Sequence, residues 1–472
     1  MSDKSFDIGM VGLGVMGRNF LLNMADHGFS VIGLDRDKSK VDALASEGAG
    51  KPVEGVTDIK QFVKQLKRPR ALMMLVPAGK PVDAVIDESV GLLDKDDIII
   101  DGGNSHFTDT NRHGSALSAK GINFLGIGIS GGEKGARFGP SMMPGGPEPA
   151  YKRVQPIFEA ASAHVDGSPC VTYLGPGSAG HYVKMVHNGI EYALMALLAE
   201  TYDLLRRGVG LSNDELADLF ADWNRTEVKS FLVEIAEQAF RQPDDKTDHR
   251  LIDMIRDRAK QKGTGKWTSQ DAMELQVPVP TIDSAVEMRD MSGFKEEREG
   301  ASEHLKIHTG KFAEDKDAFK KQLHRAFHFA MITAYAQGMA LLKVASEEYK
   351  YGLNLEDVAR IWRGGCIIRA DLLEDIRNAM KTNPNLPNLM VDPHFAKILT
   401  GYHTDLREIV RTGVSLGIPV TSYASSLGYF DSYRSAWLPA NLIQALRDNF
   451  GSHTFERIDR DGTFHTQWGK ES

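Results

Sequence analysis

The feature that most restricts the fold of this chain is a glycine-rich turn close to its N-terminus. The turn reads Gly12-Leu13-Gly14-Val15-Met16-Gly17, directly after a strand-like run at 6–11 and before a helical pattern that extends to about residue 27. The first glycine of such a turn allows a tight bend, the second lets a phosphate approach the backbone, and the third lets the helix pack on the strand. The helix start then offers free N–H groups and a positive dipole end. The turn predicts a dinucleotide-binding fold at the start of the chain.

Strand-like and helical segments alternate after this turn. A second strand is expected at 30–34, and the runs at 71–76 and 98–100 are short and apolar throughout, which is typical of strands buried on both faces. Another run follows at 123–127, whereas the stretch 139–146 is rich in Gly and Pro and is expected to be a loop. Strands that alternate with helices predict an α/β, doubly wound, Rossmann-like parallel sheet. We assign this dinucleotide-binding domain to residues 1–178.

The pattern changes at the breaker cluster Gly175-Pro176-Gly177-Ser178. From there the helical period dominates, so residues 179–440 are expected to form a large all-α domain for substrate binding and dimerisation. The last segment, 441–472, begins helical, breaks at Gly451 and ends in a short tail that contains several aromatic residues. We expect this tail to pack on a partner subunit, because it has little core of its own.

Composition excludes several classes of protein. The 472 residues carry a formal net charge of −8, so the bulk basic field of a nucleic-acid-binding protein is absent, and a phosphorylated ligand would need local cations. Two cysteines make a disulfide framework implausible. The polar start lacks the pattern of a signal peptide, and no apolar run approaches the roughly 20 residues that span a membrane. A cytoplasmic protein without nucleic-acid or membrane partners is the expectation.

One helical segment carries a polar stripe among apolar residues. Within the expected helix 181–206, the side chains at i, i+3, i+4 and i+7 are Lys184, His187, Asn188 and Glu191, which places them on one face. A solvated Lys–Glu pair is the usual explanation of charges on a helix, but here large apolar residues flank a narrow stripe. Partial burial is therefore expected, and a buried lysine readily loses its proton. The stripe indicates acid/base chemistry.

Two polar, glycine-rich segments follow expected strands. Residues 101–105 read Asp-Gly-Gly-Asn-Ser, and the segment at 126–132 ends in Ser-Gly-Gly. Ligands of doubly wound sheets bind beyond the carboxyl ends of the strands, so these segments are candidate anion-binding loops. Ordinary strand-to-helix turns are an equally good interpretation of either one alone.

Seven motifs together resemble the decarboxylating 6-phosphogluconate dehydrogenases of the β-hydroxyacid dehydrogenase superfamily. They span nearly the whole chain and comprise the turn at 12–17, DGGNS at 101–105, SGGEKGAR at 130–137, KMVHNGIEY at 184–192, QKGTGKW at 261–267, WRGGCIIR at 362–369 and PANLIQALRDNFGSHT at 439–454. The resemblance implies oxidative decarboxylation of 6-phosphogluconate to ribulose 5-phosphate and CO2 with reduction of NADP or NAD, in the pentose phosphate pathway and gluconate utilisation. It also implies a homodimer with shared active sites.

The resemblance assigns roles to individual residues. Lys184 would act as general base and then general acid, and Glu191 would protonate the enediol. Contacts to the sugar acid would come from Asn104, Ser130, Gly131, Gly132, His187, Asn188 and Tyr192. The phosphate end would be held by Lys262, Arg289, Arg447 and His453, the last two reaching into the partner's site. The cofactor would contact residues 12–17 together with Asp35, Arg36, Asp37, Val76, Pro77, Ala78 and Asn104.

The sequence also contains indications about the electron sink and the cofactor. No acidic cluster in the sequence indicates a metal, so no metal site is expected, and protonated Lys184 is expected to polarise the new carbonyl. NADP-preferring relatives typically have Asn-Arg-Thr where this chain has Asp35-Arg36-Asp37, and a lysine at Pro77. A carboxylate at the end of the second strand favours ribose hydroxyls and hence NAD. NADP is expected from the resemblance and NAD from these charges.

Three other assignments fit the sequence less well. A β-hydroxyacid dehydrogenase that does not decarboxylate is disfavoured by the chain length and by the candidate phosphate ligands. A catalytically inactive dinucleotide-binding sensor would be expected to lose Lys184 or Glu191, and both are present. A nucleotide-sugar dehydrogenase needs a cysteine nucleophile. Cys366 is expected instead to be a small buried hydrophobe.

Overall fold

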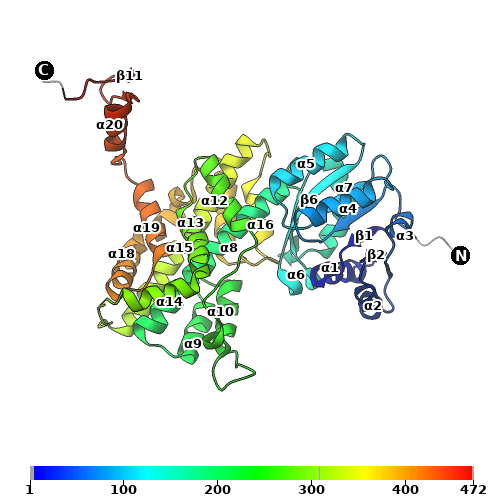
Figure 1. Ribbon diagram of the computed structural model, residues 1–472, viewed down its shortest axis with the longest axis horizontal. Helices are drawn as coiled ribbons and strands as arrows, with labels where there is room; N and C mark the ends of the chain where they lie inside the picture. Colours follow the sequence, from blue (N-terminus) through cyan, green and yellow to red (C-terminus); the bar gives the residue numbers. More distant parts are fainter. Residues whose placement is uncertain (1–4, 308, 470–472) are drawn as a thin grey trace. The chain divides into compact units, whose positions relative to one another are not determined.

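The computed structural model describes residues 5–307 and 309–469, which form two compact units. The first unit extends to Ser426 and contains a sheet with its helices and a large helical region, drawn from blue to orange in Figure 1. The second unit comprises Leu427–Ser472. No described helix is both long and apolar enough to cross a membrane. The domain boundaries expected after residues 178 and 440 remain predictions.

A seven-stranded sheet organises the N-terminal part, in the order β3-β2-β1-β4-β5-β6-β7. Its strands are β1 (Ile8–Val11), β2 (Val31–Leu34), β3 (Val53–Val56), β4 (Ala71–Met74), β5 (Ile98–Asp101), β6 (Asn123–Ser130) and β7 (Ser141–Gly145). All neighbouring strands are parallel except β6 and β7. The doubly wound prediction is confirmed. The loop expected at 139–146 is wrong, because β7 adds an antiparallel edge strand there.

Helices cover both faces of this sheet, so the strands are buried on both sides. The helices are α1 (Val15–Asp26), α2 (Lys38–Glu47), α3 (Ile59–Lys64), α4 (Lys80–Val90), α5 (Phe107–Ser118), α6 (Gly132–Phe138) and α7 (Glu148–Ala161). One core cluster joins one set of strand side chains to Phe20 of α1 and Phe158 of α7. The other cluster joins the remaining strand side chains to Phe62 of α3 and Val82 of α4. The short hairpin β8 (His164–Val165) and β9 (Ser168–Pro169) follows α7.

Helices make up the rest of the first unit. They are α8 (Ala179–Asp203) with a π-helical end (Leu204–Val209), α9 (Asn213–Trp223), α10 (Phe231–Arg241), α11 (Leu251–Met254), α12 (Thr264–Glu274), α13 (Pro280–Gly293), α14 (Lys295–His304), α15 (Lys316–Glu348), α16 (Leu355–Trp362), α17 (Leu372–Thr382), a 3-10 turn (Leu389–Val391), α18 (Pro393–Leu416) and α19 (Thr421–Tyr433). The helix α19 crosses the boundary to the second unit. The long helix α15 is buried over most of its length, because it packs against α8 and α18.

The helix α8 connects the two parts of the first unit, since it contacts the sheet as well as α12, α13 and α15 (Figure 1). Glycines allow the close approach. A Cβ atom added at Gly128 of β6 would lie 2.2 Å from Cβ of Lys184, and one added at Gly180 would lie 2.2 Å from the Met143 carbonyl oxygen. Any larger residue at these glycines would push α8 away from the sheet. The polar stripe of α8 is therefore held directly against the end of β6.

The second unit contains α20 (Ala440–Gly451) and the hairpin β10 (Phe455–Glu456) and β11 (Thr463–Phe464). Its centre is the buried carboxylate of Asp448, which accepts hydrogen bonds from Thr454 N–H at 2.9 Å and Trp468 Nε1 at 2.9 Å and pairs with His465. The helix and the tail are thus tied together by polar contacts. The helix end expected at Gly451 is confirmed.

Candidate active site

The polar stripe of α8 is partly buried, as the sequence predicted: Lys184 and His187 are buried, and Asn188 and Glu191 are partly exposed. Lys184 is 5% exposed and His187 is fully buried, whereas the Glu191 side chain is 20% exposed. Burial lowers the pKa of the Lys184 ammonium against the opposing effect of Glu191. Burial likewise raises the pKa of the Glu191 carboxyl, although the positive charges of Lys184 and Arg289 act in the other direction. Both shifts favour the neutral forms, a lysine amine and a protonated carboxylic acid.

A hydrogen-bond network connects this stripe to the sheet. Lys184 Nζ donates to Asn188 Oδ1, and His187 Nδ1 lies 2.9 Å from the same oxygen. The other ring nitrogen, His187 Nε2, lies 3.2 Å from Ser130 Oγ at the end of β6. Burial lowers the pKa of His187 well below its ordinary value, so the ring is neutral. A proton on Nδ1 satisfies both contacts, with Ser130 donating to Nε2.

Two members of the network were missed in the sequence. Thr264, the first residue of α12, accepts a hydrogen bond from Asn188 Nδ2 at 3.0 Å. The backbone N–H of Ile367 donates to Ser130 Oγ at 3.3 Å, from the loop after α16. Both residues lie inside motifs quoted above, but spacing along the chain contains no sign of these contacts. The network orients Asn188 and Ser130, so their positions do not depend on a ligand.

Arg289 of α13 lies over the end of the stripe. Its guanidinium carbon is 3.4 Å from the centre of the Tyr192 ring, a close cation–π contact. Because Tyr192 follows Glu191 on α8, this contact brings a permanent positive charge next to the acid/base pair. Lys262 is exposed in the segment before α12. The role of Arg289 and Lys262 as ligands for an anionic substrate group stays a prediction.

The loops at the sheet edge have different environments. Asp101 ends β5 and accepts hydrogen bonds from Gly103 N–H at 2.9 Å and Ser105 Oγ at 2.5 Å, so this carboxylate shapes its own turn. Asn104, between these residues, is exposed and available to a ligand. Gly131 has a φ of +125°, and a Cβ atom there would meet the Gly365 carbonyl oxygen at 2.5 Å. The turn after Ser130 therefore requires glycine.

Arg447 and His453 are not brought to this site by any described contact. Both are exposed in the second unit, where Arg447 donates a hydrogen bond to Gln444 Oε1 at 3.1 Å.

Cys366 is fully buried and donates to the Trp362 carbonyl oxygen at 3.0 Å. Burial raises its pKa to about 12, so this thiol is no nucleophile, as predicted. Among the described residues, no three His, Cys, Asp or Glu side chains are grouped in a way that could hold a metal ion.

The glycine turn between β1 and α1 fits a dinucleotide pyrophosphate. Gly12 has a φ of +94°, and a Cβ atom at Gly17 would lie 1.9 Å from the Gly12 carbonyl oxygen, so both positions need glycine. A Cβ atom at Gly14 would meet nothing within 4 Å, which leaves the backbone open on that side. No side chain caps the N-terminus of α1. Its first N–H groups are therefore free to bind a phosphate.

Asp35 is held firmly at the end of β2. Its carboxylate accepts hydrogen bonds from Leu13 N–H at 2.9 Å and Asp37 N–H at 3.0 Å, and Lys40 Nζ lies 3.3 Å away. Burial alone would raise the pKa of Asp35, but these partners outweigh it and keep the pKa below its ordinary value. Asp35 is thus a fixed carboxylate. Lys40 is a nearby cation that was not predicted at this site from the sequence.

A cavity of about 380 Å³ lies between the turn and α4. Its lining includes Asp35, Arg36, Val76 and Pro77, which are expected at the adenosine end of a dinucleotide, but neither Asp37 nor Ala78. The lining residues are Val11, Gly12, Leu34, Asp35, Arg36, Thr57, Asp58, Ile59, Val76, Pro77, Pro81, Ala84, Val85 and Glu88. The cavity lies at the carboxyl ends of β1 to β4, where such sheets bind nucleotides.

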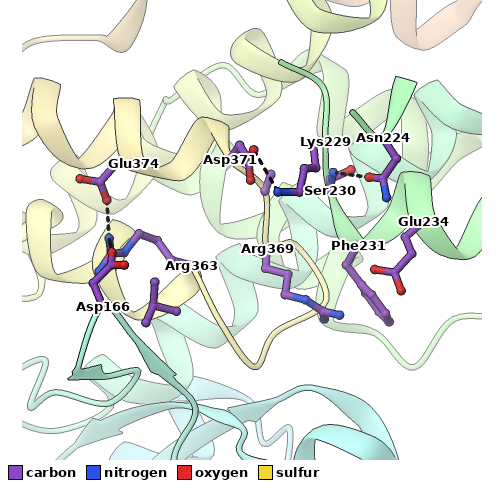
Figure 2. A pocket seen from close by; sticks show the side chains of 12 residues that line it. Asp166, Asn224, Lys229, Ser230, Phe231, Glu234, Arg363, Arg369, Asp371 and Glu374 are labelled. Carbon is purple, nitrogen blue, oxygen red and sulfur yellow. Dashed lines mark hydrogen bonds and ion pairs between the residues drawn. The ribbon is translucent and has the colours of Figure 1, made fainter. Parts of the chain in front are cut away.

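A second cavity of similar volume lies between the β8–β9 hairpin, α10 and the loop after α16 (Figure 2). Its charges are largely compensated. Arg363 pairs with Glu374 and Asp166, and Lys229 lies 3.4 Å from Asp371. Arg369 stacks over the Phe231 ring with its guanidinium carbon 3.7 Å from the ring centre. Because its cations are paired with carboxylates, this second cavity is a poor site for a phosphorylated acid.

Comparisons with known proteins agree with this geometry. Residues 7–175 match the NAD binding domain of 6-phosphogluconate dehydrogenase, and residues 180–468 match the 6-phosphogluconate dehydrogenase C-terminal domain. The chain is 49% identical to an NADP(+)-dependent, decarboxylating 6-phosphogluconate dehydrogenase of Bacillus subtilis, over 98% of this chain and 99% of that protein. It is 48% identical to a decarboxylating 6-phosphogluconate dehydrogenase of Staphylococcus aureus, over the same shares of the two chains.

A solved structure of Plasmodium falciparum 6-phosphogluconate dehydrogenase has the same fold, with a TM-score of 0.95 and 42% identity over 98% of this chain and 100% of that one. That enzyme was determined without ligands, with its cofactor NADP+ and with its substrate 6-phosphogluconate. Both domain models and full-length relatives thus converge on one assignment: this chain belongs to the 6-phosphogluconate dehydrogenase family, whose curated relatives are decarboxylating oxidoreductases.

Proposed function

We propose that this protein oxidises 6-phosphogluconate and decarboxylates the product to ribulose 5-phosphate, with reduction of NADP, as a cytoplasmic enzyme of the pentose phosphate pathway. The single observation that carries the proposal is the pair Lys184 and Glu191, a buried and a partly buried proton-transfer group on one face of α8. The named activities of the full-length relatives support the same reaction.

Lys184 is the proposed base of the first step. Burial favours its neutral amine, which can take the proton of the hydroxyl on carbon 3. The nicotinamide, when bound, accepts the hydride from that carbon. Lys184 is then an ammonium beside the new carbonyl oxygen and can donate a hydrogen bond to it. Asn188, which already accepts a hydrogen bond from Lys184 Nζ, keeps the amine in place through both steps.

Glu191 is the proposed acid of the last step. Loss of carbon dioxide from the 3-keto acid leaves an enediol, and carbon 1 of this enediol must receive a proton. A carboxylic acid whose pKa is raised by burial is suited to give it. Lys184 and Glu191 lie two helical turns apart, so two successive transfers use two separate groups. Protonated Lys184 would serve as the electron sink in place of a metal ion, as the sequence predicts.

The remaining predicted substrate residues stay proposals. Ser130, Gly131, Gly132, His187 and Asn188 would bind the sugar acid together with Asn104 and Tyr192. Lys262 and Arg289 would hold the phosphate. Because the whole chain has a net charge of −8, strong charge-assisted hydrogen bonds to an anion must come from local cations such as these. Arg447 and His453 would complete the phosphate site from the partner subunit.

We expect the enzyme to accept both NADP and NAD. Asp35 is fixed where it favours ribose hydroxyls, and Pro77 supplies no cation, but Arg36 and Lys40 moderate the repulsion of a 2′-phosphate. Steady-state assays with 6-phosphogluconate and each cofactor, with carbon dioxide trapped in parallel, measure this directly. A preference for NADP above about a hundredfold would contradict the charge argument. Failure to release carbon dioxide with either cofactor would contradict the proposed reaction.

The second unit supports the proposal of a homodimer. Leu442, Ile443, Leu446 and Phe450 of α20 are between 54% and 74% exposed. Apolar side chains spaced along one helix in this way are typical of a contact with another protein surface. The proposed partner is a second copy of this chain, whose phosphate site would receive Arg447 and His453.

Mixed dimers test the shared site. Chains with Lys184→Ala and chains with Arg447→Ala are each expected to be nearly inactive as homodimers. In a heterodimer one of the two sites would contain both native residues, so mixing with subunit exchange should restore measurable activity, up to about a quarter of the wild-type value if exchange is random. Mass spectrometry of differently tagged chains verifies exchange. Complete exchange without any recovered activity would overturn the shared-site proposal.

A further inference from the structure

The adenosine-end cavity contains more negative than positive side chains. Three carboxylates, Asp35, Asp58 and Glu88, line the cavity. Among the described residues, Arg36 is the positively charged residue in its lining. A nucleotide with a free 2′-hydroxyl adds no charge at this end, whereas a 2′-phosphate brings between one and two negative charges, as other phosphomonoesters do. The way in which each carboxylate is bound therefore determines which nucleotide fits.

Two of the three carboxylates are committed to the backbone. Asp35 accepts hydrogen bonds from the N–H groups of Leu13 and Asp37. Asp58 is the N-cap of α3 and accepts from Gln61 N–H at 2.8 Å. Hydrogen bonds of this kind satisfy the oxygen atoms and spread their charge over neighbouring dipoles. Among the described contacts, neither Asp35 nor Asp58 pairs with Arg36.

Glu88 differs from both. It belongs to α4, across the cavity from the end of β2, and its carboxylate pairs with the Arg36 guanidinium. Both side chains are well exposed, at 80% for Arg36 and 45% for Glu88, so the pair is held by charge and not by packing. Arg36 is thereby occupied by an internal anion at the position where a guanidinium would otherwise grip a phosphate bidentately.

We propose that Glu88 is a specificity-determining residue that weakens the binding of NADP relative to NAD. A 2′-phosphate must displace Glu88 from Arg36 or share the guanidinium with it, and in both cases the two anions repel each other. NAD makes no such demand. This inference rests on the proposed function for the identity of the cofactor, and its physical basis is the Arg36–Glu88 pair.

Glu88→Gln keeps the size of the side chain and removes its charge. We expect the ratio of kcat/KM for NADP to that for NAD to rise roughly two- to fivefold, the scale of one exposed charge pair. Glu88→Lys adds a cation and should raise the ratio further, by roughly ten- to a hundredfold. The KM for 6-phosphogluconate should stay unchanged, because α4 lies far from α8 along the chain and does not pack against it.

Equilibrium binding gives a readout that needs no turnover. Titration with NADPH and with NADH, followed by cofactor fluorescence, should show tighter NADPH binding in Glu88→Gln and an unchanged affinity for NADH. The gain should shrink between about 0.01 M and 1 M salt, as the Debye length falls from about 30 Å to 3 Å. Competition by adenosine 2′,5′-bisphosphate and by AMP tests the adenosine end alone.

Asp87→Asn is the matched control. Asp87 precedes Glu88 on α4 and is exposed, but it does not line the cavity. Its neutralisation changes the net charge equally and should leave the cofactor ratio within about twofold of wild type. An unchanged ratio in Glu88→Gln, or an equal change in Asp87→Asn, would overturn the proposal. Absence of 6-phosphogluconate oxidation in the wild type would instead count against the proposed function, with the titrations still testing Glu88.

Discussion

Replacement of Lys184 by alanine is expected to lower turnover by a factor of about a hundred or more, the usual scale for a lost general acid/base. Lys184 is the proposed base for the hydroxyl proton and the proposed donor to the new carbonyl, so both roles disappear together. Cofactor binding should persist, because the glycine turn and the cavity beside α4 do not include this residue. Steady-state kinetics and a cofactor titration measure the two quantities.

Chemical rescue separates a lost base from a damaged fold. Lys184 is buried against Gly128, so its truncation leaves a small space that a primary amine such as ethylamine could enter. Added amines should restore part of the activity of Lys184→Ala. They should not rescue Lys184→Met, in which the side chain fills the space without an amine. Near-normal turnover in either variant would show that Lys184 is not the base.

Replacement of Glu191 by glutamine is expected to reduce turnover by a similar factor, about a hundredfold or more. Glutamine keeps the shape and can still form hydrogen bonds, but it cannot give a proton to carbon 1. The pH profile adds a second test. A raised pKa means that Glu191 loses its proton as the pH rises through that value, so it sets the high-pH limb of activity. Lys184 must be neutral, so its protonation sets the low-pH limb.

Glu191→Gln should therefore lose the high-pH limb attributed to Glu191, and the low-pH limb should remain. Glu200 supplies the matched control, because it is another buried carboxyl on α8, and burial raises its pKa to about 7. It accepts hydrogen bonds from Ser422 and Tyr423 N–H at the start of α19 and has no proposed part in the chemistry. Glu200→Gln should leave the shape of the pH profile unchanged. A Glu191→Gln enzyme with wild-type turnover would refute the acid assignment.

The layout of the N-terminal sheet could be predicted from sequence because local patterns report it. Short apolar runs marked β1, β2, β4 and β5, and the glycine turn marked the start of α1. The pattern did not reveal β3, in which only Val56 is buried, or β7, whose Pro144 and Gly145 suggested a loop. An edge strand can tolerate such residues, since it forms hydrogen bonds on one side only.

The residues of the candidate site were predictable to a lesser extent. The spacing of the four polar residues on α8 placed them on one helical face, and the structure confirms this. Lys184, His187 and Asn188 share a hydrogen-bond network, and Glu191 lies close to His187. The partners that complete the network, Thr264 and the backbone of Ile367, come from segments far along the chain. Helical periodicity describes neighbours within a few turns, so it contains no information on these contacts.

The sequence by itself determined the doubly wound sheet, the long helix with its acid/base stripe and the glycine turn, because each depends on a repeat or a backbone requirement within a short segment. The tertiary structure alone decided how charged these groups are and which partners hold them. The pKa shifts of Lys184 and Glu191 come mainly from burial, which results from packing of α8 against the sheet and its neighbouring helices. The pair of Arg36 and Glu88 joins residues 52 positions apart, and only folding brings their charges together.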